Sequence, residues 1–217
     1  MELKAVFVDA AGTLMKPREP VGVTYARQAQ LRGHDVDPVD VQIRFRAAMR
    51  DRRSPTDGMG DGRAFWHDVV TESIGAEDRP LSDTLYAWYA EPRAWWVDVE
   101  ALQILGLVAR QGVRLGIISN WDLRLRALYT RFALDRMFPV LICSSEIGFE
   151  KPDPRIFHVA CEVAGVRPGQ AAHIGDDPER DVSGANAAGL VGLIYDEDLG
   201  WTSIRERLAR LRSPLWR

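Results

Sequence analysis

The chain opens with a short apolar run and then changes its hydrophobic periodicity twice. Residues 4–8 include Ala5-Val6-Phe7-Val8, a run that is typical of a fully buried strand. From about Pro17 to Arg93 apolar positions recur at three- and four-residue spacing, which predicts helices and gives no strand signal. The predicted helices lie near 20–33, 38–53, 62–75 and 81–91.

From about Val97 the pattern alternates between amphipathic segments and short buried ones. It predicts helices at 99–111, 122–133, 153–164, 180–188 and from about 202, and strands at 113–119, 140–143, 171–174 and 191–195. Such alternation indicates a parallel sheet with helices on both faces. We therefore expect an α/β protein with a parallel-sheet core, residues 1–16 and 96–217, and an inserted α-helical cap, residues 17–95.

Composition and charge restrict the class of protein. An apolar fraction of 46% over 217 residues is enough for a proper core, and a net charge of −3 argues against nucleic acid as a partner. No stretch approaches the roughly 18 apolar residues that span a bilayer, and the first strand begins at once, so we expect neither a membrane segment nor a signal peptide. Cys143 and Cys161 lack the spacing of a metal site or a disulfide framework, which favours a cytoplasmic protein.

Two polar sites follow predicted strands in the first half of the core. Asp9 comes directly after the first strand and precedes a Gly turn, and a carboxylate at such a strand end can act as a nucleophile or a metal ligand. Ser119 and Asn120 end the second strand, where a hydroxyl and an amide can donate hydrogen bonds to an anion. A turn-forming Asp and a helix N-cap are the alternative interpretations.

Two further sites follow in the second half. Lys151 stands at the start of a predicted helix, where a positive charge opposes the helix dipole, so either an acidic or phosphate partner or an ordinary surface position fits. Asp176, Asp177 and Asp181 follow the predicted strand 171–174. Carboxylates at this spacing repel one another without a cation and suit Mg²⁺, although a solvated acidic turn is the alternative.

These four signals, in this order and each near the end of a predicted parallel strand, resemble motifs I to IV of the haloacid dehalogenase superfamily. The stretches Ser119–Asp122, Lys151–Phe157 and His173–Asp177 resemble the haloacid-dehalogenase-like domain-containing hydrolases of subfamily I, which carry a small helical cap after motif I. The resemblance covers the whole predicted core. It implies a Rossmann-like core, a Mg²⁺-dependent hydrolase and a small phosphorylated molecule as substrate.

The resemblance also implies a role for each motif residue. Asp9 is expected to form an aspartyl-phosphate, Ser119 with Asn120 nearby to bind the phosphoryl group, and Lys151 to neutralise charge. Mg²⁺ is expected to bind Asp9, Asp176 and the backbone carbonyl of Ala11, with Asp177 or Asp181 supporting the metal. Phosphoryl transfer depends mostly on such positioning and charge neutralisation.

Position 11 departs from the phosphatase pattern. Phosphatases of this superfamily usually carry a second Asp two residues after the nucleophile, which protonates the leaving group and then activates water. Ala11 can do neither, and general acid–base catalysis typically contributes about 10²–10⁴-fold. We expect slow hydrolysis of ordinary monoesters, and selectivity for good leaving groups such as acyl phosphates.

Other activities remain open at this point. Phosphonoacetaldehyde hydrolases also carry Ala at this position but use a cap lysine, and residues 17–95 contain none. Haloacid dehalogenases usually show Tyr here and no metal-binding acidic pair, so Asp176 and Asp177 argue against them. A catalytically impaired phosphate-binding or interaction protein is the main alternative to a selective phosphatase.

The cap is expected to determine the substrate, but its sequence says little. Its aromatic residues are expected to pack the cap and its contact with the core rather than a ligand. They are Phe65, Trp66, Trp88, Trp95 and Trp96. The Gly-rich segment 54–62, flanked by Arg52, Arg53 and Arg63, is a candidate for facing the site, with solvated surface arginines as the favoured alternative. No feature fixes the oligomeric state.

Overall fold

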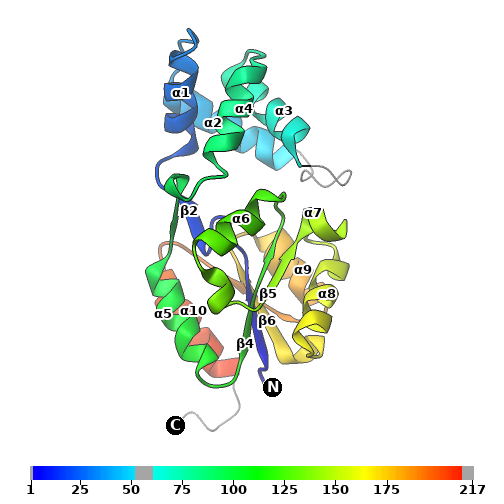
Figure 1. Cartoon of the computed structure of the whole chain (residues 1–217). Coiled ribbons are helices and arrows are strands. Elements are labelled where there is room, and N and C mark those ends of the chain that lie inside the picture. Colours follow the sequence, from blue (N-terminus) through cyan, green and yellow to red (C-terminus); the bar gives the residue numbers. More distant parts are fainter. Residues whose placement is uncertain (1, 52–60, 212–217) are drawn as a thin grey trace.

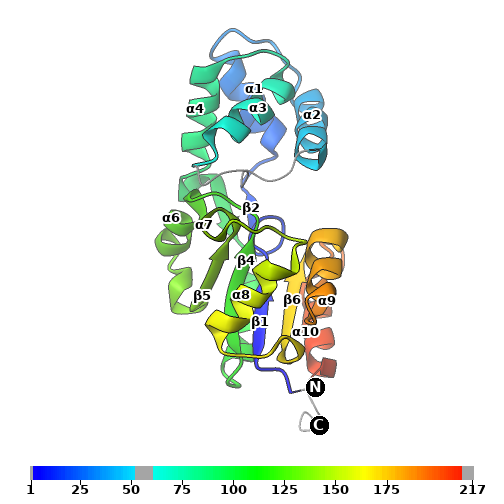
Figure 2. The same cartoon turned by 90° about the vertical axis from the view of Figure 1, so that its right-hand side faces the viewer.

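A five-stranded parallel sheet forms the centre of the protein. The computed structural model describes residues 2–51 and 61–211, and its sheet has the order β5-β4-β1-β6-β7 (Figures 1 and 2). The strands are β1 (Ala5–Val8), β4 (Arg114–Ser119), β5 (Val140–Cys143), β6 (Ala171–Gly175) and β7 (Val191–Ile194). The first strand of the chain is central, between β4 and β6, so the residue that follows it lies in the middle of one sheet edge. The predicted α/β class is confirmed.

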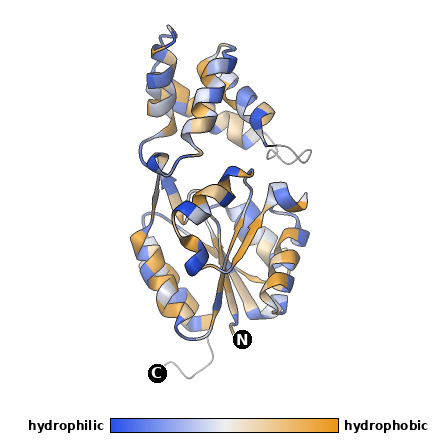
Figure 3. Ribbon diagram, viewed as in Figure 1, coloured by the Kyte–Doolittle hydropathy of each residue, from blue (hydrophilic) through white to orange (hydrophobic). Residues whose placement is uncertain are grey.

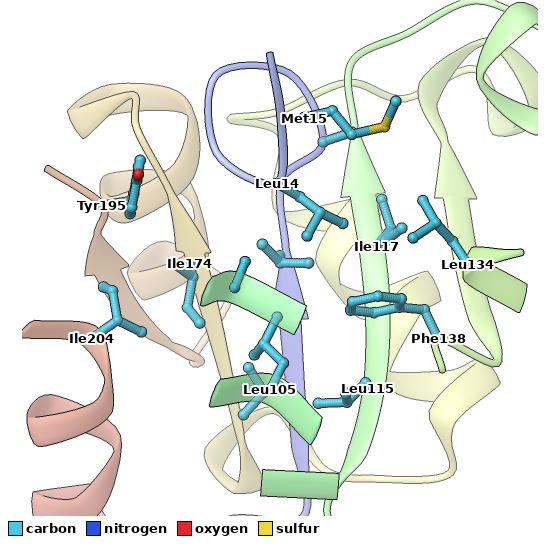
Figure 4. Packing of buried hydrophobic residues seen from close by; sticks show 14 of the residues in the cluster. Leu14, Met15, Leu105, Leu115, Ile117, Leu134, Phe138, Ile174, Tyr195 and Ile204 are labelled. Carbon is cyan, nitrogen blue, oxygen red and sulfur yellow. The ribbon is translucent and has the colours of Figure 1, made fainter. Parts of the chain in front are cut away.

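Helices cover both faces of the sheet. Successive side chains of β1 point to opposite faces, and all four are buried. Val6 and Val8 belong to a core that includes residues of α5 (Val99–Ala109), α6 (Arg124–Arg131) and α10 (Gly200–Leu211). Ala5 and Phe7 point to the opposite face, where α8 (Pro154–Ala164) and α9 (Gly184–Ala187) pack. Figure 4 shows the first face, with Leu105 of α5 and Ile204 of α10 against strand residues such as Leu115 and Ile174.

Four helices between β1 and the rest of the sheet form a separate group above its carboxyl edge (Figure 1). They are α1 (Val21–Gln30), α2 (Pro38–Asp51), α3 (Arg63–Ile74) and α4 (Arg79–Trp88). They enclose an apolar core of their own that includes Tyr25, Val41, Val70 and Leu85. The helices lie within the insertion that the sequence predicts at 17–95, and the boundaries of that domain stay a prediction. Apolar segments, orange in Figure 3, run along the central strands and the helices around them.

A two-stranded antiparallel ribbon joins the helical group to the core. It consists of β2 (Met15–Pro17) and β3 (Trp95–Val97), with Lys16 opposite Trp96. The sequence does not predict these strands, because three residues are too few to show an alternating pattern. The Lys16 ammonium lies over the rings of Trp96 and Tyr195 and pairs with Glu197, so it ties this ribbon to the loop after β7.

The remaining elements are short. They are α7 (Ser144–Ile147), the 3₁₀ turns η1 (Pro92–Ala94), η2 (Leu134–Arg136) and η3 (Pro168–Gln170), and the π-helical turn η4 (Pro178–Ser183). The helix predicted at 180–188 is therefore two segments, η4 followed by α9. Within the described ranges, no helix has both the length and the apolar character needed to cross a membrane. Most of the Gly-rich segment 54–62 lies outside the described residues.

Candidate active site

The predicted site residues belong to strand ends and loops at the carboxyl edge of the sheet. This edge faces the helical group (Figure 1). Asp9 follows β1, Ser119 ends β4 and Asp176 follows β6. Because β1 pairs with both β4 and β6, these three strand ends are neighbours. Lys151 arrives from the loop between α7 and α8, and its side chain is only 3% exposed. The loop therefore brings a buried cation to a cluster of carboxylates.

Lys151 bridges two of these carboxylates. Its Nζ lies 2.6 Å from Oδ1 of Asp9 and 2.5 Å from Oδ1 of Asp181. The same oxygen of Asp181 is 2.8 Å from Nε2 of His173, and Oδ2 of Asp181 accepts the backbone N–H of Asp177 at 3.0 Å. Asp181 is thus fully engaged, and it holds the ammonium beside Asp9. Ion pairs that are buried in this way need such additional hydrogen bonds to be stable.

Asn120 fixes the backbone of Lys151 rather than standing free. Its Oδ1 accepts the Lys151 N–H at 2.7 Å, and its Nδ2 donates to the Lys151 carbonyl at 2.8 Å. This side chain therefore links the end of β4 to the lysine loop. Ser119 is buried at the last position of β4, next to this contact. The predicted contacts of Ser119 and Asn120 with a phosphoryl group stay predictions.

Asp176 lies beside Asp9 and Asp181. Each of the three offers a carboxylate oxygen, and these oxygens lie within 4.8 Å of one another. Asp176 also accepts a hydrogen bond from the Thr13 hydroxyl at 3.1 Å. Two glycines make the close approach possible. A Cβ on Gly12, which has φ +86°, would meet the Asp176 carboxylate at 2.5 Å, and one on Gly175 would meet the Asp181 Cγ at 2.0 Å.

Within this cluster of described residues the carboxylates outnumber the ammonium group. Burial raises the pKa of Asp9 to about 6, and Asp181 and Asp176 add to the rise while Lys151 opposes it. Burial also raises the pKa of Asp176. For Asp181 burial acts in the same direction, but Lys151 and His173 outweigh it and lower the pKa. Three carboxylates and one ammonium leave an excess of negative charge, and a divalent cation would offset it.

Asp177 stands outside this cluster. Its Oδ1 accepts the backbone N–H groups of Glu179 and Arg180 at 2.9 and 2.8 Å, so the carboxylate caps η4. Ala11 is exposed and its backbone bridges to Met15. Between the two acidic residues considered as metal support, the geometry thus places Asp181 with the cluster and Asp177 at a helix cap. The backbone carbonyl of Ala11 stays a predicted ligand.

A cavity of about 390 Å³ lies between the helical group and the carboxyl edge of the sheet. Its lining includes Ala11, Gly12 and Asp176 from the core, together with residues of α1 to α4. Of the aromatic side chains expected only to pack the cap, Phe65, Trp66 and Trp95 line this cavity. The sequence does not reveal that these rings border a cavity, because hydrophobic periodicity marks the inner face of an element without showing whether that face meets protein or a cavity. The expectation that they pack rather than contact a ligand stays a prediction.

A buried ion pair joins the helical group to the core at this cavity. Oδ1 and Oδ2 of Asp122 accept from Nε and a terminal nitrogen of Arg124 at 2.8 and 2.6 Å. Trp66 of α3 donates from Nε1 to Asp122 at 2.7 Å, and Arg124 donates to the Tyr86 carbonyl of α4 at 3.1 Å. The guanidinium also stacks on the Tyr86 ring, 3.9 Å from its centroid. Asp122 and Arg124 are both buried, and their bonds to Trp66 and Tyr86 connect the core to the helical group.

We expect Asp122→Ala to lower the free energy of unfolding by about 3–5 kcal/mol, because it leaves the buried guanidinium of Arg124 unpaired. Urea unfolding followed by circular dichroism measures this. Glu146→Ala is the matched control, since it removes the carboxylate from a two-point pair with the exposed Arg126 and should cost less than about 1 kcal/mol. Equal costs in the two variants would contradict a structural role of the Asp122 pair.

Comparison with known proteins agrees with this arrangement. The sequence model of the haloacid dehalogenase-like hydrolase family matches residues 3–189. The chain belongs to this family. The bovine (Bos taurus) haloacid dehalogenase-like hydrolase domain-containing protein 3 is 33% identical over 202 residues, which cover 88% of the chain and 80% of the relative.

Two other similarities are more limited. A phosphoserine phosphatase of Thermus thermophilus is 33% identical over 136 residues, 62% of this chain and 54% of that protein. The structure of the L-2-haloacid dehalogenase of Xanthobacter autotrophicus matches with a TM-score of 0.66 at 22% identity, covering 87% of this chain and 75% of that one. The second match shows the fold alone. The resemblance that the motifs indicated is thus confirmed at the level of the hydrolase family.

Proposed function

We propose that this hydrolase is a Mg²⁺-dependent phosphatase that acts through an aspartyl-phosphate on a small phosphorylated molecule. The observation that carries the proposal is the buried Lys151 ammonium, held by Asp181 against Asp9 at the end of the central strand. A nucleophilic carboxylate with a fixed cation beside it suits phosphoryl transfer, which depends on positioning and on charge neutralisation. The partial similarity to a phosphoserine phosphatase supports the same reaction class.

The reaction has two steps on Asp9. Lys151 occupies Oδ1, so Oδ2 is the oxygen proposed to attack phosphorus. The new bond from Oδ2 to phosphorus forms as the bond to the leaving oxygen breaks, and the leaving group departs with the electron pair of that bond. Water then attacks the same phosphorus, the bond to Oδ2 breaks, and phosphate is released. In both steps Lys151 offsets the negative charge that develops on the carboxylate and the phosphoryl oxygens.

The donor set fits Mg²⁺. Asp9 and Asp176 each offer a carboxylate oxygen, their pKa values are raised by burial, and the excess negative charge favours a small divalent cation. Asp9, Asp176 and the carbonyl of Ala11 would hold the ion, with Asp181 at the edge of the cluster. When bound, Mg²⁺ supplies positive charge that stabilises the phosphoryl oxygens.

No second carboxylate that could replace the missing acid is found in the part of the cavity lining that the structure describes. Among the described residues that line the cavity, Asp176 is the only carboxylate, and it is proposed as a metal ligand. The proposed substrates are therefore phosphorylated molecules whose leaving group is a weak base. The lack of a general acid at position 11 also supports the alternative, a catalytically impaired phosphate-binding protein. Haloacid dehalogenation is less consistent with the site, because Asp176 and Asp181 place extra negative charge beside the nucleophile.

Mg²⁺ titration tests the metal site. We expect Asp176→Asn to weaken Mg²⁺ binding at least about tenfold, since loss of a direct ligand should cost no less than loss of an outer-shell partner. Asp177→Asn is the neighbouring control, because an Asn side chain can still cap η4 and the affinity should stay unchanged. Calorimetry on the three proteins measures both effects. Equal affinities in wild type and Asp176→Asn would remove Asp176 from the metal site.

Hydrolysis of acetyl phosphate tests the reaction itself. The wild-type protein should release phosphate with Mg²⁺ present and lose this activity on treatment with a chelator. Mg²⁺ binding without turnover of any phosphate would favour the impaired alternative. Release of halide from a 2-haloacid, without need for Mg²⁺, would instead indicate a dehalogenase.

A further inference from the structure

The cavity above Asp9 differs in character between its two ends. At the core end its lining includes Ala11, Gly12 and Asp176, beside the proposed nucleophile. At the cap end it is enclosed by α1 to α4. The volume of about 390 Å³ falls within the range of roughly 300–1,000 Å³ that small-molecule sites occupy. A substrate whose phosphate reaches Asp9 must therefore place the rest of its structure against the cap.

The cap end is apolar and rich in aromatic rings. Among the described residues, the cap contributes no charged side chain to the lining. Its aromatic members come from all four helices, the turn after α4 and the start of β3. They are Tyr25, Phe45, Phe65, Trp66, Tyr86, Tyr89 and Trp95.

The charged residues found in the described part of the lining belong to the core. They are Asp176, Arg124 and Arg180. The positive charge of Arg124 is already matched by the two oxygens of Asp122, and its guanidinium is stacked on Tyr86. Arg180 is part of η4, which directly follows the acidic residues of the site. Among the described residues the polar atoms at the cap end include the tyrosine hydroxyls, of which that of Tyr89 is buried without a hydrogen-bond partner. A charged group there would lose its hydration and find no opposite charge, which is costly.

The residue at position 11 independently restricts the leaving group of the substrate. The side chain of Ala11 carries no acid, so the leaving oxygen must depart without a proton from this position. Phenols leave as resonance-stabilised anions and depend less on an acid than sugar or alkyl alcohols do. An aromatic ring also matches the ring-lined cap end, where stacked and edge-on contacts add to simple burial.

We propose that the substrates are phosphate monoesters of uncharged, apolar aryl alcohols, with the ring held against the cap. This inference rests on the proposed phosphatase function and specifies its substrate class. Phosphorylated amino acids, sugars and nucleotides are disfavoured by the same argument, because their several charged or polar groups would face mostly rings and aliphatic side chains, with the tyrosine hydroxyls as partners among the described residues. The cap end thus selects the leaving group, and the core end performs the chemistry.

Two aryl phosphates of similar leaving ability separate ring recognition from leaving-group chemistry. 1-Naphthyl phosphate is uncharged beyond its phosphate, and 4-carboxyphenyl phosphate carries an added carboxylate. We expect kcat/KM for 1-naphthyl phosphate to exceed that for 4-carboxyphenyl phosphate by at least about tenfold, because fit in an apolar pocket is worth that order of discrimination. Equal values would overturn the inference, while hydrolysis of acetyl phosphate by the same protein would leave the phosphatase function standing.

A charge introduced at the cap end gives the matched variant test. Met49 of α2 lines the cavity, whereas Ile43 of the same helix is 61% exposed. We expect Met49→Glu to lower kcat/KM for 1-naphthyl phosphate at least about tenfold, and to change that for acetyl phosphate less than about twofold, since only the larger group reaches the cap. Ile43→Glu should change neither. Equal loss for both substrates in Met49→Glu would contradict a role in ring recognition.

Binding measurements test the aryl proposal if the protein hydrolyses none of the phosphorylated compounds. The wild-type protein is then titrated with 1-naphthyl phosphate and with glycerol 3-phosphate by calorimetry. Tighter binding of the naphthyl compound that Met49→Glu weakens would support an aryl site without catalysis. Equal binding of the two compounds, or binding that Met49→Glu leaves unchanged, would overturn the aryl proposal, independently of the fate of the phosphatase function.

Discussion

Asp9→Asn should lower kcat for acetyl phosphate by at least about 10⁴-fold, the order of loss seen when a catalytic nucleophile or its partner is removed. The amide cannot form the aspartyl-phosphate, although its oxygen can still accept the hydrogen bond from Lys151. Steady-state phosphate release on purified protein measures the effect. The residual rate should equal that of the uncatalysed reaction with Mg²⁺ in the same buffer.

The same variant should not be less stable than the wild type when Mg²⁺ is absent. The folded-state pKa of Asp9 is raised to about 6 by burial, above its ordinary value, so the ionised carboxylate destabilises the fold at neutral pH. This cost is present above the folded pKa and disappears as the pH falls below the unfolded one. Replacing the carboxylate with a neutral amide removes it. Urea unfolding at pH 7.5 checks this, and a large loss of stability in Asp9→Asn would mean that the activity loss reflects misfolding.

Ala11→Asp should raise turnover of alkyl phosphates such as glycerol 3-phosphate by about 10²–10⁴-fold, the contribution that general acid–base groups typically make. The Ala11 side chain is exposed, and the residue lines the cavity beside Gly12 and Asp176. A carboxyl group at this position would therefore enter the space that the leaving oxygen occupies. It could donate a proton to that oxygen in the first step and accept one from water in the second.

Ala11→Asn is the control for this gain, since it has nearly the same shape and cannot transfer a proton. The first step with acetyl phosphate should respond less than that with glycerol 3-phosphate, because its leaving group needs no acid. Single-turnover kinetics with both substrates separate phosphorylation from hydrolysis. An equal gain in Ala11→Asn would show that shape, not acidity, limits the reaction. A gain on acetyl phosphate alone would contradict the role proposed for position 11.

The core of the fold is predictable because its signals are local. Each strand of the sheet is a short buried run, and each intervening helix has an amphipathic pattern, so periodicity alone locates them. The ribbon β2–β3 is not predictable in this way, because its three-residue strands are defined by their pairing across residues 15–17 and 95–97. The π-helical geometry of η4 likewise depends on its surroundings, where Asp177 caps the turn and Asp181 reaches back to Lys151.

The sequence by itself determined the order of chemical groups along the chain: Asp9 after β1, Ser119 at the end of β4, Lys151 before α8 and the acidic stretch after β6. This order indicates one site because parallel strands place their carboxyl ends on one edge, whatever the rest of the chain does. Only the tertiary structure decided that Asp181, not Asp177, joins the cluster. Both residues follow the same strand, but the side chain of Asp181 contacts Lys151 whereas that of Asp177 caps η4. It also decided that Trp66 meets Asp122 and that cap rings enclose a cavity, because those contacts join segments far apart in sequence.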